Sequence, residues 1–305
     1  DGMELAAVYS RNLETGKAFS KKYGNKAVFT DLEQMAKGDL IDSVYIASPN
    51  VLHYEQSRIF LESGKHVLCE KPITVTSSQI KELVDLAKHK NLVYLEAIMM
   101  LHLPARKVLQ DLLRKIGNIT TARFDFSRIS SEYKSYLEGG LPNIFNPRLA
   151  TGCLMDLGIY CIYPAIDFFG VPKKIFATAG FLNTGADGYG NSIFVYKDKQ
   201  VNLSYSKVGN SQLGSEIIGD KGTILINSIS KLTNMKIIWK DGSEEEIIGD
   251  IPKHILMNGE AQSFYNYVTN ITRYENEYRY ASELSVRVCE VMQIIQEQSN
   301  IKFGL

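Results

Sequence analysis

Residues 65–72, with the sequence KHVLCEKP, are the stretch around which the rest of the chain can be interpreted. The apolar run 66–69 predicts a short buried strand. That strand must end at Glu70 and Lys71, because Pro72 has no N–H group for a central ladder. A carboxylate and an ammonium therefore end a strand, at the edge where open parallel sheets bind their ligands. The plainer alternative is a surface ion pair beside a turn.

The composition is that of a globular, cytoplasmic protein. A length of 305 residues predicts two domains, and 45% hydrophobic with 22% charged residues is typical of globular proteins. The 34 basic residues balance the 34 acidic ones, so charge gives no argument for binding nucleic acid or a membrane. No apolar run reaches transmembrane length. The four cysteines form no C-x-x-C pair, so we expect buried thiols, no metal site and no disulfide. They are Cys69, Cys153, Cys161 and Cys289.

The first hundred residues predict an α/β domain. Apolar strands are expected at 5–9, 26–29, 43–47, 66–69 and 92–95, separated by helical stretches. Capping-box patterns at 30–33 and 76–79 predict the starts of two of those helices. Such alternation predicts βαβ units around a parallel sheet. We therefore assign residues 1–100 to a Rossmann-like, dinucleotide-binding domain.

The pattern changes after residue 100. Helices are expected at 104–115, 154–169, 260–272 and 282–298, with a long loop over 130–152. Short strands separated by turn residues predominate between 175 and 248, which predicts a largely antiparallel open sheet. The glycine-rich stretch 185–190 is expected to be a flexible loop rather than a phosphate cradle. We therefore assign residues 101–305 to an α+β domain for substrate binding and oligomerisation.

Four stretches, in this order, resemble one protein family. They are Tyr9-Ser10-Arg11, the stretch 47–50 with His53, the stretch 64–72, and the stretch 152–160 (GCLMDLGIY). The chain is similar to the glucose–fructose oxidoreductase / inositol dehydrogenase / rhizopine-catabolism (Gfo/Idh/MocA) family. Tyr160 and the stretch 96–99 resemble its dimeric dihydrodiol dehydrogenase and glucose–fructose oxidoreductase branches. The resemblance implies a nicotinamide-binding Rossmann domain followed by an α/β domain with an open sheet.

The resemblance also implies a catalytic group of Lys71, Asp156 and Tyr160. Asp156 and Tyr160 are four residues apart, so on a helix they share a face. The alternative is an amphipathic helix whose Asp and Tyr merely face water. We expect Tyr160 to exchange the proton of the reacting oxygen, and Lys71 to lower the pKa of its phenol from about 10. Asp156 would orient the substrate or the Lys–Tyr pair.

The residues after the first strand predict the choice of cofactor. NAD-specific folds place an acid at that strand end, whereas this chain has Ser10 and Arg11, which suit a 2′-phosphate. NADP(H) is therefore preferred and NAD(H) is possible. A solvated arginine that opens a helix is the alternative for Arg11, and a satisfied ring at a helix start is the alternative for His53. The resemblance places five further residues along the cofactor: Pro49, Asn50, His53, Glu70 and Lys71.

Together these patterns predict an NADP(H)-dependent oxidoreductase. It would transfer hydride between nicotinamide and a secondary alcohol or carbonyl of a sugar, polyol, dihydrodiol or small carbonyl compound. A non-catalytic NAD(P)-binding regulator and an NAD-dependent glycosidase are the alternatives, but a regulator needs no catalytic Lys, Asp and Tyr. The loop 127–150, with Tyr133, Tyr136 and Arg148, would line the substrate pocket. Self-association through the second-domain sheet would give a homodimer or homotetramer.

One element of a Rossmann domain is missing from the pattern. Such a domain begins with a strand and a Gly-x-Gly-x-x-Gly turn that lets the backbone approach the pyrophosphate. The first strand here, 5–9, has the features of the second strand of that fold. We therefore expect about 20 to 30 further residues before Asp1 in the natural protein. An intact mass of 34.3 kDa for native protein would contradict this expectation.

Overall fold

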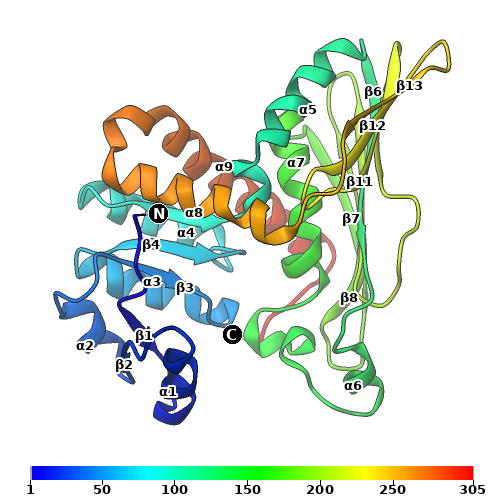
Figure 1. Ribbon diagram of the computed structural model, residues 1–305. Coiled ribbons are helices and arrows are strands. Elements are labelled where there is room, and N and C mark those ends of the chain that lie inside the picture. Colours follow the sequence, from blue (N-terminus) through cyan, green and yellow to red (C-terminus); the bar gives the residue numbers. More distant parts are fainter. Residues whose placement is uncertain (1, 305) are drawn as a thin grey trace.

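The structure, a computed structural model that describes residues 2–304, contains a parallel α/β region and a large, mostly antiparallel sheet (Figure 1). The predicted fold class is confirmed. The parallel strands are β1 (Ala7–Tyr9), β2 (Ala27–Phe29), β3 (Ser43–Ile46), β4 (His66–Glu70) and β5 (Tyr94–Ala97). Four helices accompany them: α1 (Leu13–Lys21), α2 (Leu32–Lys37), α3 (His53–Glu62) and α4 (Ser77–His89).

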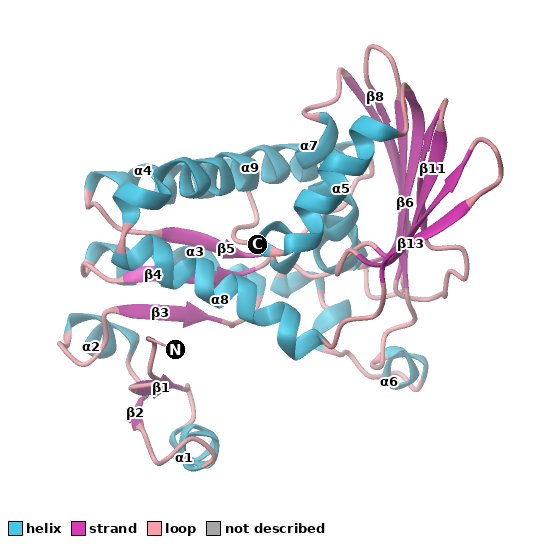
Figure 2. Cartoon of the chain, turned by 45° about the horizontal axis from the view of Figure 1, so that its top comes forward, coloured by secondary structure: helices cyan, strands magenta, loops and turns pink. Residues whose placement is uncertain are grey.

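The parallel strands form two groups. β1 pairs with β2, and β3, β4 and β5 pair in that order, but within residues 2–304 no strand pairing joins the two groups (Figure 2). The helix starts follow from local capping. The predicted capping box of Thr76 and Gln79 opens α4, whereas α2 is capped by Asp31, one residue after the predicted Thr30.

The second sheet has eight strands. Their order is β13-β12-β11-β10-β6-β9-β8-β7, and every neighbouring pair is antiparallel except β6 with β9. The bounds are β6 (Ile119–Ser127), β7 (Lys174–Phe181), β8 (Asp187–Val195), β9 (Gln200–Ser206), β10 (Ser215–Gly219), β11 (Gly222–Ser228), β12 (Thr233–Trp239) and β13 (Glu244–Ile248). Two expectations were wrong here: β8 begins at Asp187, inside the predicted flexible loop, and α6 (Tyr133–Leu137) lies inside the predicted loop 130–152.

Helices cover one face of this sheet, and the other face is open (Figure 1). They are α5 (Pro104–Lys115), α7 (Ile159–Phe169), α8 (Lys253–Thr269) and α9 (Ile271–Gln298). Alternate strand residues such as Phe124, Leu203 and Ile224 fill the core beneath the helices. On the open face, Phe176 and Ile193 are cross-strand partners and both side chains are exposed. None of the helices in residues 2–304 is long and apolar enough to cross a membrane.

The last helix, α9, packs against both regions (Figure 2). The main-chain N–H of Tyr94 in β5 donates to the Tyr278 hydroxyl at 3.0 Å, and Ser77 at the start of α4 donates to Gln293. Cys289 belongs to the core of the parallel region, whereas most buried residues of α9 belong to the core under the large sheet. The division into residues 1–100 and 101–305 therefore stays a prediction.

A buried ion pair ties three of these helices together. Arg106 of α5 donates two hydrogen bonds of 2.7 Å to the two carboxylate oxygens of Asp167 in α7, and Tyr280 of α9 donates a third. The Asp167 side chain is 0% exposed. Such a carboxylate is stabilised only by its partners, so removal of one partner leaves a buried charge uncompensated.

We expect Asp167→Ala to lower the free energy of unfolding by about 3 to 5 kcal/mol, because it leaves Arg106 without its buried partner. Chemical denaturation followed by circular dichroism measures this change. The control is Asp111→Ala, which removes the exposed partner of Lys107 on α5 and should leave the transition nearly unchanged. Equal effects of the two substitutions would show that the Arg106–Asp167 pair is not a structural anchor.

Candidate active site

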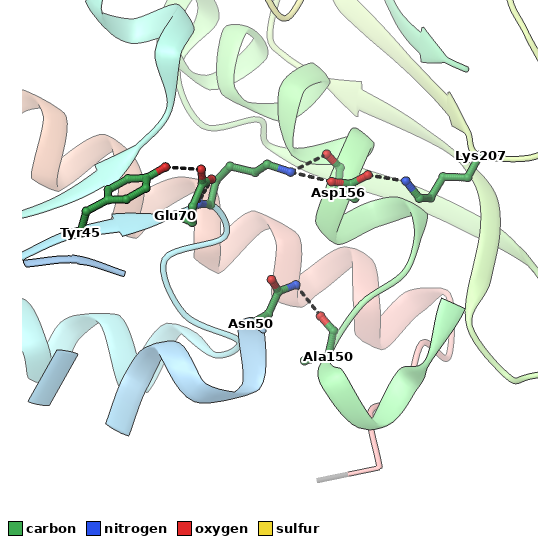
Figure 3. A network of polar contacts seen from close by, with 7 residues as sticks. Tyr45, Asn50, Glu70, Ala150, Asp156 and Lys207 are labelled. Carbon is green, nitrogen blue, oxygen red and sulfur yellow. Dashed lines mark hydrogen bonds and ion pairs between the residues drawn. The ribbon is translucent and has the colours of Figure 1, made fainter. Parts of the chain in front are cut away.

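Lys71 lies where the parallel region meets the large sheet. It follows β4, and its ammonium donates to Oδ1 of Asp156 at 2.7 Å and to the main-chain oxygen of Asp156 at 3.0 Å (Figure 3). The other carboxylate oxygen of Asp156, Oδ2, pairs with the ammonium of Lys207, just after β9. The structure thus brings the predicted Lys71 and Asp156 together and adds a second ammonium.

Asp156 lies on an unusual helical turn. Residues Leu154–Gly158 form a π-helical turn that leads into α7, so the expected helix 154–169 is present and its first turn is π-helical. Asp187 of β8 anchors the turn, because its Oδ2 accepts a 2.6 Å hydrogen bond from the N–H of Leu154. Gly152 makes room for this contact, since a Cβ there would lie 1.9 Å from Oδ1 of Asp187. Turns of this kind are frequent at functional sites.

The two ammonium groups keep Asp156 ionised. Burial alone would raise the pKa of its carboxyl, but Lys71 and Lys207 outweigh burial and hold that pKa at about 2. Burial likewise acts to lower the pKa of Lys71, yet the carboxylate of Asp156 raises it above its ordinary value. Near neutral pH the pair therefore consists of a carboxylate and an ammonium, and neither group is suited to exchange a proton with a substrate.

Tyr160 completes the predicted group through its ring. The ammonium of Lys71 lies 5.0 Å from the ring centroid of Tyr160, and Phe126 contacts the same ring edge-on at 5.5 Å between centroids. Our expectation of a lowered phenol pKa was wrong. Burial raises the pKa of Tyr160, the positive charge of Lys71 offsets only part of this, and the carboxylates of Glu70 and Asp156 add to the rise. The neutral phenol is thus the resting form, ready to donate a proton.

Glu70 and Glu96 hold the strand ends around Lys71. Glu70 accepts a hydrogen bond from the Tyr45 hydroxyl of β3 and another, of 3.2 Å, from the N–H of Lys71 (Figure 3). The buried carboxyl of Glu96, in β5, accepts from the N–H of Ile73 at 2.8 Å and from the Tyr163 hydroxyl of α7. Burial raises the pKa of Glu96. The turn that presents Lys71 is therefore fixed by two carboxyl groups, one at the end of β4 and one on the neighbouring strand β5.

The predicted cofactor residues fall into two groups. Asn50, His53, Glu70 and Lys71 line one open cleft, together with Asp156, at the carboxyl ends of β3 and β4; Ser48, Pro72, Ile144, Thr151 and Met155 complete its lining. Pro49 lies in the sequence between Ser48 and Asn50, which both line the cleft. Ser10 and Arg11 follow β1, at the carboxyl end of another parallel strand, and Arg11 is exposed. Within residues 2–304 its guanidinium makes no hydrogen bond or ion pair.

Two of these residues already have protein partners. The side-chain amide of Asn50 donates to the main-chain oxygen of Ala150 at 2.8 Å, across the cleft (Figure 3). His53 is fully buried, and its two ring nitrogens each lie 2.8 Å from a main-chain oxygen, of Ser48 and of Pro72. Burial lowers the pKa of His53, and a neutral ring donates to only one of these two acceptors. A ring engaged with protein groups is the alternative raised for His53, and it bridges the ends of β3 and β4. Its contact with a cofactor stays a prediction.

The loop predicted to determine specificity reaches the cleft at one end. Ile144 and Thr151 line the cleft, whereas Tyr133 and Tyr136 of α6 pack against each other and against Phe145. These aromatic contacts explain why a helix forms where a loop was expected. The backbone N–H of Arg148 donates to the Asn146 side chain, and the role of Arg148 in specificity stays a prediction.

Comparisons with known proteins agree with this geometry. Residues 1–97 match the model of the oxidoreductase family with an NAD-binding Rossmann fold, and residues 105–225 match the GFO/IDH/MocA C-terminal domain. The chain belongs to the Gfo/Idh/MocA oxidoreductase family. The scyllo-inositol 2-dehydrogenase (NADP(+)) IolU of Bacillus subtilis is 36% identical over 99% of this chain and 92% of its own length.

More distant members of the Gfo/Idh/MocA family are also similar. The trans-1,2-dihydrobenzene-1,2-diol dehydrogenase of Xenopus tropicalis is 29% identical over 74% of this chain and 67% of its own length. A crystal structure of KijD10, a 3-ketoreductase from Actinomadura kijaniata in complex with NADP and TDP-benzene, superposes with a TM-score of 0.83. The superposition covers 97% of this chain and 90% of that chain, and at 22% identity it shows a shared fold.

Sequence reasoning missed Lys207 and Asp187 in this family member. Lys207 follows an alternating strand without any motif around it, and Asp187 lies in a glycine-rich stretch that resembles a loop. Both side chains are buried, at 6% for Lys207 and 0% for the whole of Asp187. Charged residues are rarely buried, so both residues stand out in the structure. The sequence around each of them does not indicate that it is buried.

We expect Gly152→Ala to destabilise the π-helical turn, because its Cβ would displace Asp187 from Leu154. Gly139→Ala is the matched control: Gly139 also has a positive φ, +88°, but no atom lies within 4 Å of the added Cβ. Backbone strain alone costs about 1 to 2 kcal/mol. Denaturant unfolding should therefore show a clearly larger loss for Gly152→Ala, and equal losses would mean that the Asp187 contact is dispensable.

Proposed function

We propose that this protein is an NADP(H)-dependent oxidoreductase that interconverts a secondary alcohol and a carbonyl of a sugar, polyol, dihydrodiol or small carbonyl compound. The observation that carries the proposal is that Lys71 and Asp156 pair in the lining of one open cleft, with the ring centroid of Tyr160 5.0 Å from the Lys71 ammonium. The relatives named for NADP(+), scyllo-inositol and dihydrodiols support the cofactor and the class of substrate. A regulator without catalysis has no need of this group.

The residues around the cleft suit a nicotinamide dinucleotide. Ser10 and Arg11 would hold the 2′-phosphate end, and Pro49, Asn50, Glu70 and Lys71 would line the path toward the reacting end. His53 would act indirectly, by fixing the positions of the ends of β3 and β4. When bound, the nicotinamide supplies or accepts the hydride. The chain itself supplies the binding groups and the proton donor.

Tyr160 would transfer the proton. In the direction of reduction, its neutral phenol donates a proton to the carbonyl oxygen, and burial favours this neutral form. In the direction of oxidation, the phenol must first lose its proton, and the neighbouring ammonium of Lys71 favours that loss. Asp156 would remain a carboxylate and orient Lys71. Proton transfer is thus assigned to Tyr160 and electrostatic support to Lys71.

Lys71→Ala and Tyr160→Phe should each lower kcat by about 10² to 10⁴ while the fold is retained, because they remove the electrostatic and the proton-transfer group. Asp156→Asn should be milder, since its role is orientation. The assay follows NADPH absorbance with a panel of sugars, polyols and dicarbonyls. Lys17→Ala and Tyr23→Phe, both exposed, serve as controls. Near-wild-type kcat for Lys71→Ala or Tyr160→Phe would remove that residue from the mechanism.

Arg11→Ala should weaken NADP(H) binding far more than NAD(H) binding. The exposed guanidinium makes no contact within residues 2–304, so a 2′-phosphate would be its partner. One charge-assisted hydrogen bond corresponds to about one to two decades of affinity. Fluorescence titration of the full-length protein with both cofactors measures the effect, with Lys17→Ala, in the helix α1 that follows Arg11, as the control. A wild-type protein that binds both cofactors equally would contradict the role of Ser10 and Arg11.

The open face of the large sheet suits self-association, so we propose a homodimer or homotetramer. Phe176, Tyr189 and Ile193 are exposed there, and β7 is the sheet's edge strand. Ile193→Asp should shift the mass measured by light scattering toward the monomer, whereas Leu40→Asp, at an exposed leucine outside the large sheet, should not. A monomeric wild type would refute the proposal. The four buried free cysteines support a cytoplasmic location.

A further inference from the structure

Lys207 is a buried ammonium that no part of the predicted mechanism uses. Its side chain is 6% exposed, and it reaches from the end of β9 to Oδ2 of Asp156. Lys71 holds the opposite oxygen, Oδ1, from the parallel region. The carboxylate of Asp156 therefore lies between two ammonium groups that come from different sheets (Figure 3).

This arrangement fixes the direction in which Asp156 faces. A carboxylate held at one oxygen can rotate, whereas one held at both oxygens by separate donors cannot do so without breaking an ion pair. The main-chain N–H of Lys207 also donates to the oxygen of Gly188, and the N–H of Ser130 donates to the oxygen of Lys207. The ammonium of Lys207 thus projects from a backbone that is itself hydrogen-bonded on both sides.

The sharing of one carboxylate also changes what Lys71 can do. If Asp156 paired with Lys71 alone, its charge would cancel the influence of that ammonium on the nearby Tyr160 ring. Because Lys207 draws on the same carboxylate, more of the positive charge of Lys71 remains unbalanced at Tyr160. The carboxylate of Glu70, at the end of β4, and the carboxyl of Glu260, in α8, lie near Tyr160, and burial raises the pKa of Glu260 to about 8. Asp187 and Cys153 lie near Lys207.

We propose that Lys207 is a positioning residue of the reaction: it holds the carboxylate of Asp156 so that the ammonium of Lys71 stays directed at Tyr160. This inference rests on the proposed oxidoreductase function. Lys207 acts through Asp156 and is not among the residues that line the open cleft, so we assign it no direct contact with substrate. Its contribution should be visible in the proton transfer of Tyr160 rather than in the binding of the cofactor.

The test compares Lys207→Met, which removes the charge, with Lys207→Arg, which keeps it. We expect Lys207→Met to lower kcat/KM for alcohol oxidation by up to about 100-fold at neutral pH. The midpoint of its rising pH profile should move upward by about one pH unit, because loss of a positive charge disfavours the phenolate. Lys207→Arg should keep the wild-type midpoint. The dissociation constant for NADP(+) should change less than about threefold, which fluorescence titration measures.

Two further variants serve as controls for the proposed role of Lys207. Lys107→Met, at an exposed lysine of α5, should leave the rate and the pH profile unchanged. If Lys207→Met folds poorly, Lys207→Gln, which keeps a hydrogen-bond donor without the charge, should show the same shift of midpoint. A lower rate with an unshifted midpoint would mean that Lys207 only supports the fold, and the proposal would be overturned.

A failure of the proposed function would look different. In that case wild-type protein would show no turnover with any substrate of the panel. The pairing is still testable by thermal unfolding, because Lys207→Met and Asp156→Asn disrupt the same contact. The double variant should be only slightly less stable than the less stable of the two single variants. Fully additive losses would overturn the proposed pairing even without an activity assay.

Discussion

The carboxylate of Asp156 is the point on which the arrangement of the site depends. It receives Lys71 from the parallel region and Lys207 from the large sheet, so one side chain joins the two halves of the cleft. Buried ammonium groups are costly unless they are paired. Removal of this single carboxylate would therefore leave two buried positive charges facing one another. The carboxylate of Asp156 thus determines both the geometry of the cleft and the electrostatics of the site.

The supports of this carboxylate come from several elements. Asp187 of β8 fixes the π-helical turn, Glu96 of β5 fixes the turn after Lys71, and His53 ties together the ends of β3 and β4. Each support is a buried polar group with main-chain partners, which restricts the backbone more than side-chain pairs do. A site built in this way can hold Tyr160 neutral and Lys71 charged within a few ångströms, with little freedom for either to move.

Much of the fold was predictable from the chain. The strands ending at Glu70 and Ile46, the capping box at Thr76 and the group of Lys71 and Asp156 followed from local patterns and from the ordered motifs. The features that the sequence did not predict depend on contacts between residues far apart in the chain. The glycines in the first half of β8 led to the prediction of a loop. In the structure a glycine is needed at position 190, because the ring of Tyr205 packs against it. Lys207 and the pKa of Tyr160 depend on burial, which no local pattern reports.

The long helix α9 has a consequence for how the protein is made. Its residues complete the core of the parallel region, where Cys289 packs and Tyr278 bonds to β5, although some 180 residues separate them from those strands. Domains generally fold from the N-terminus during synthesis. Here the outer surface of α4 and β5 stays uncovered while the whole large sheet is translated. The nascent chain therefore carries an exposed apolar surface until α9 has been synthesised.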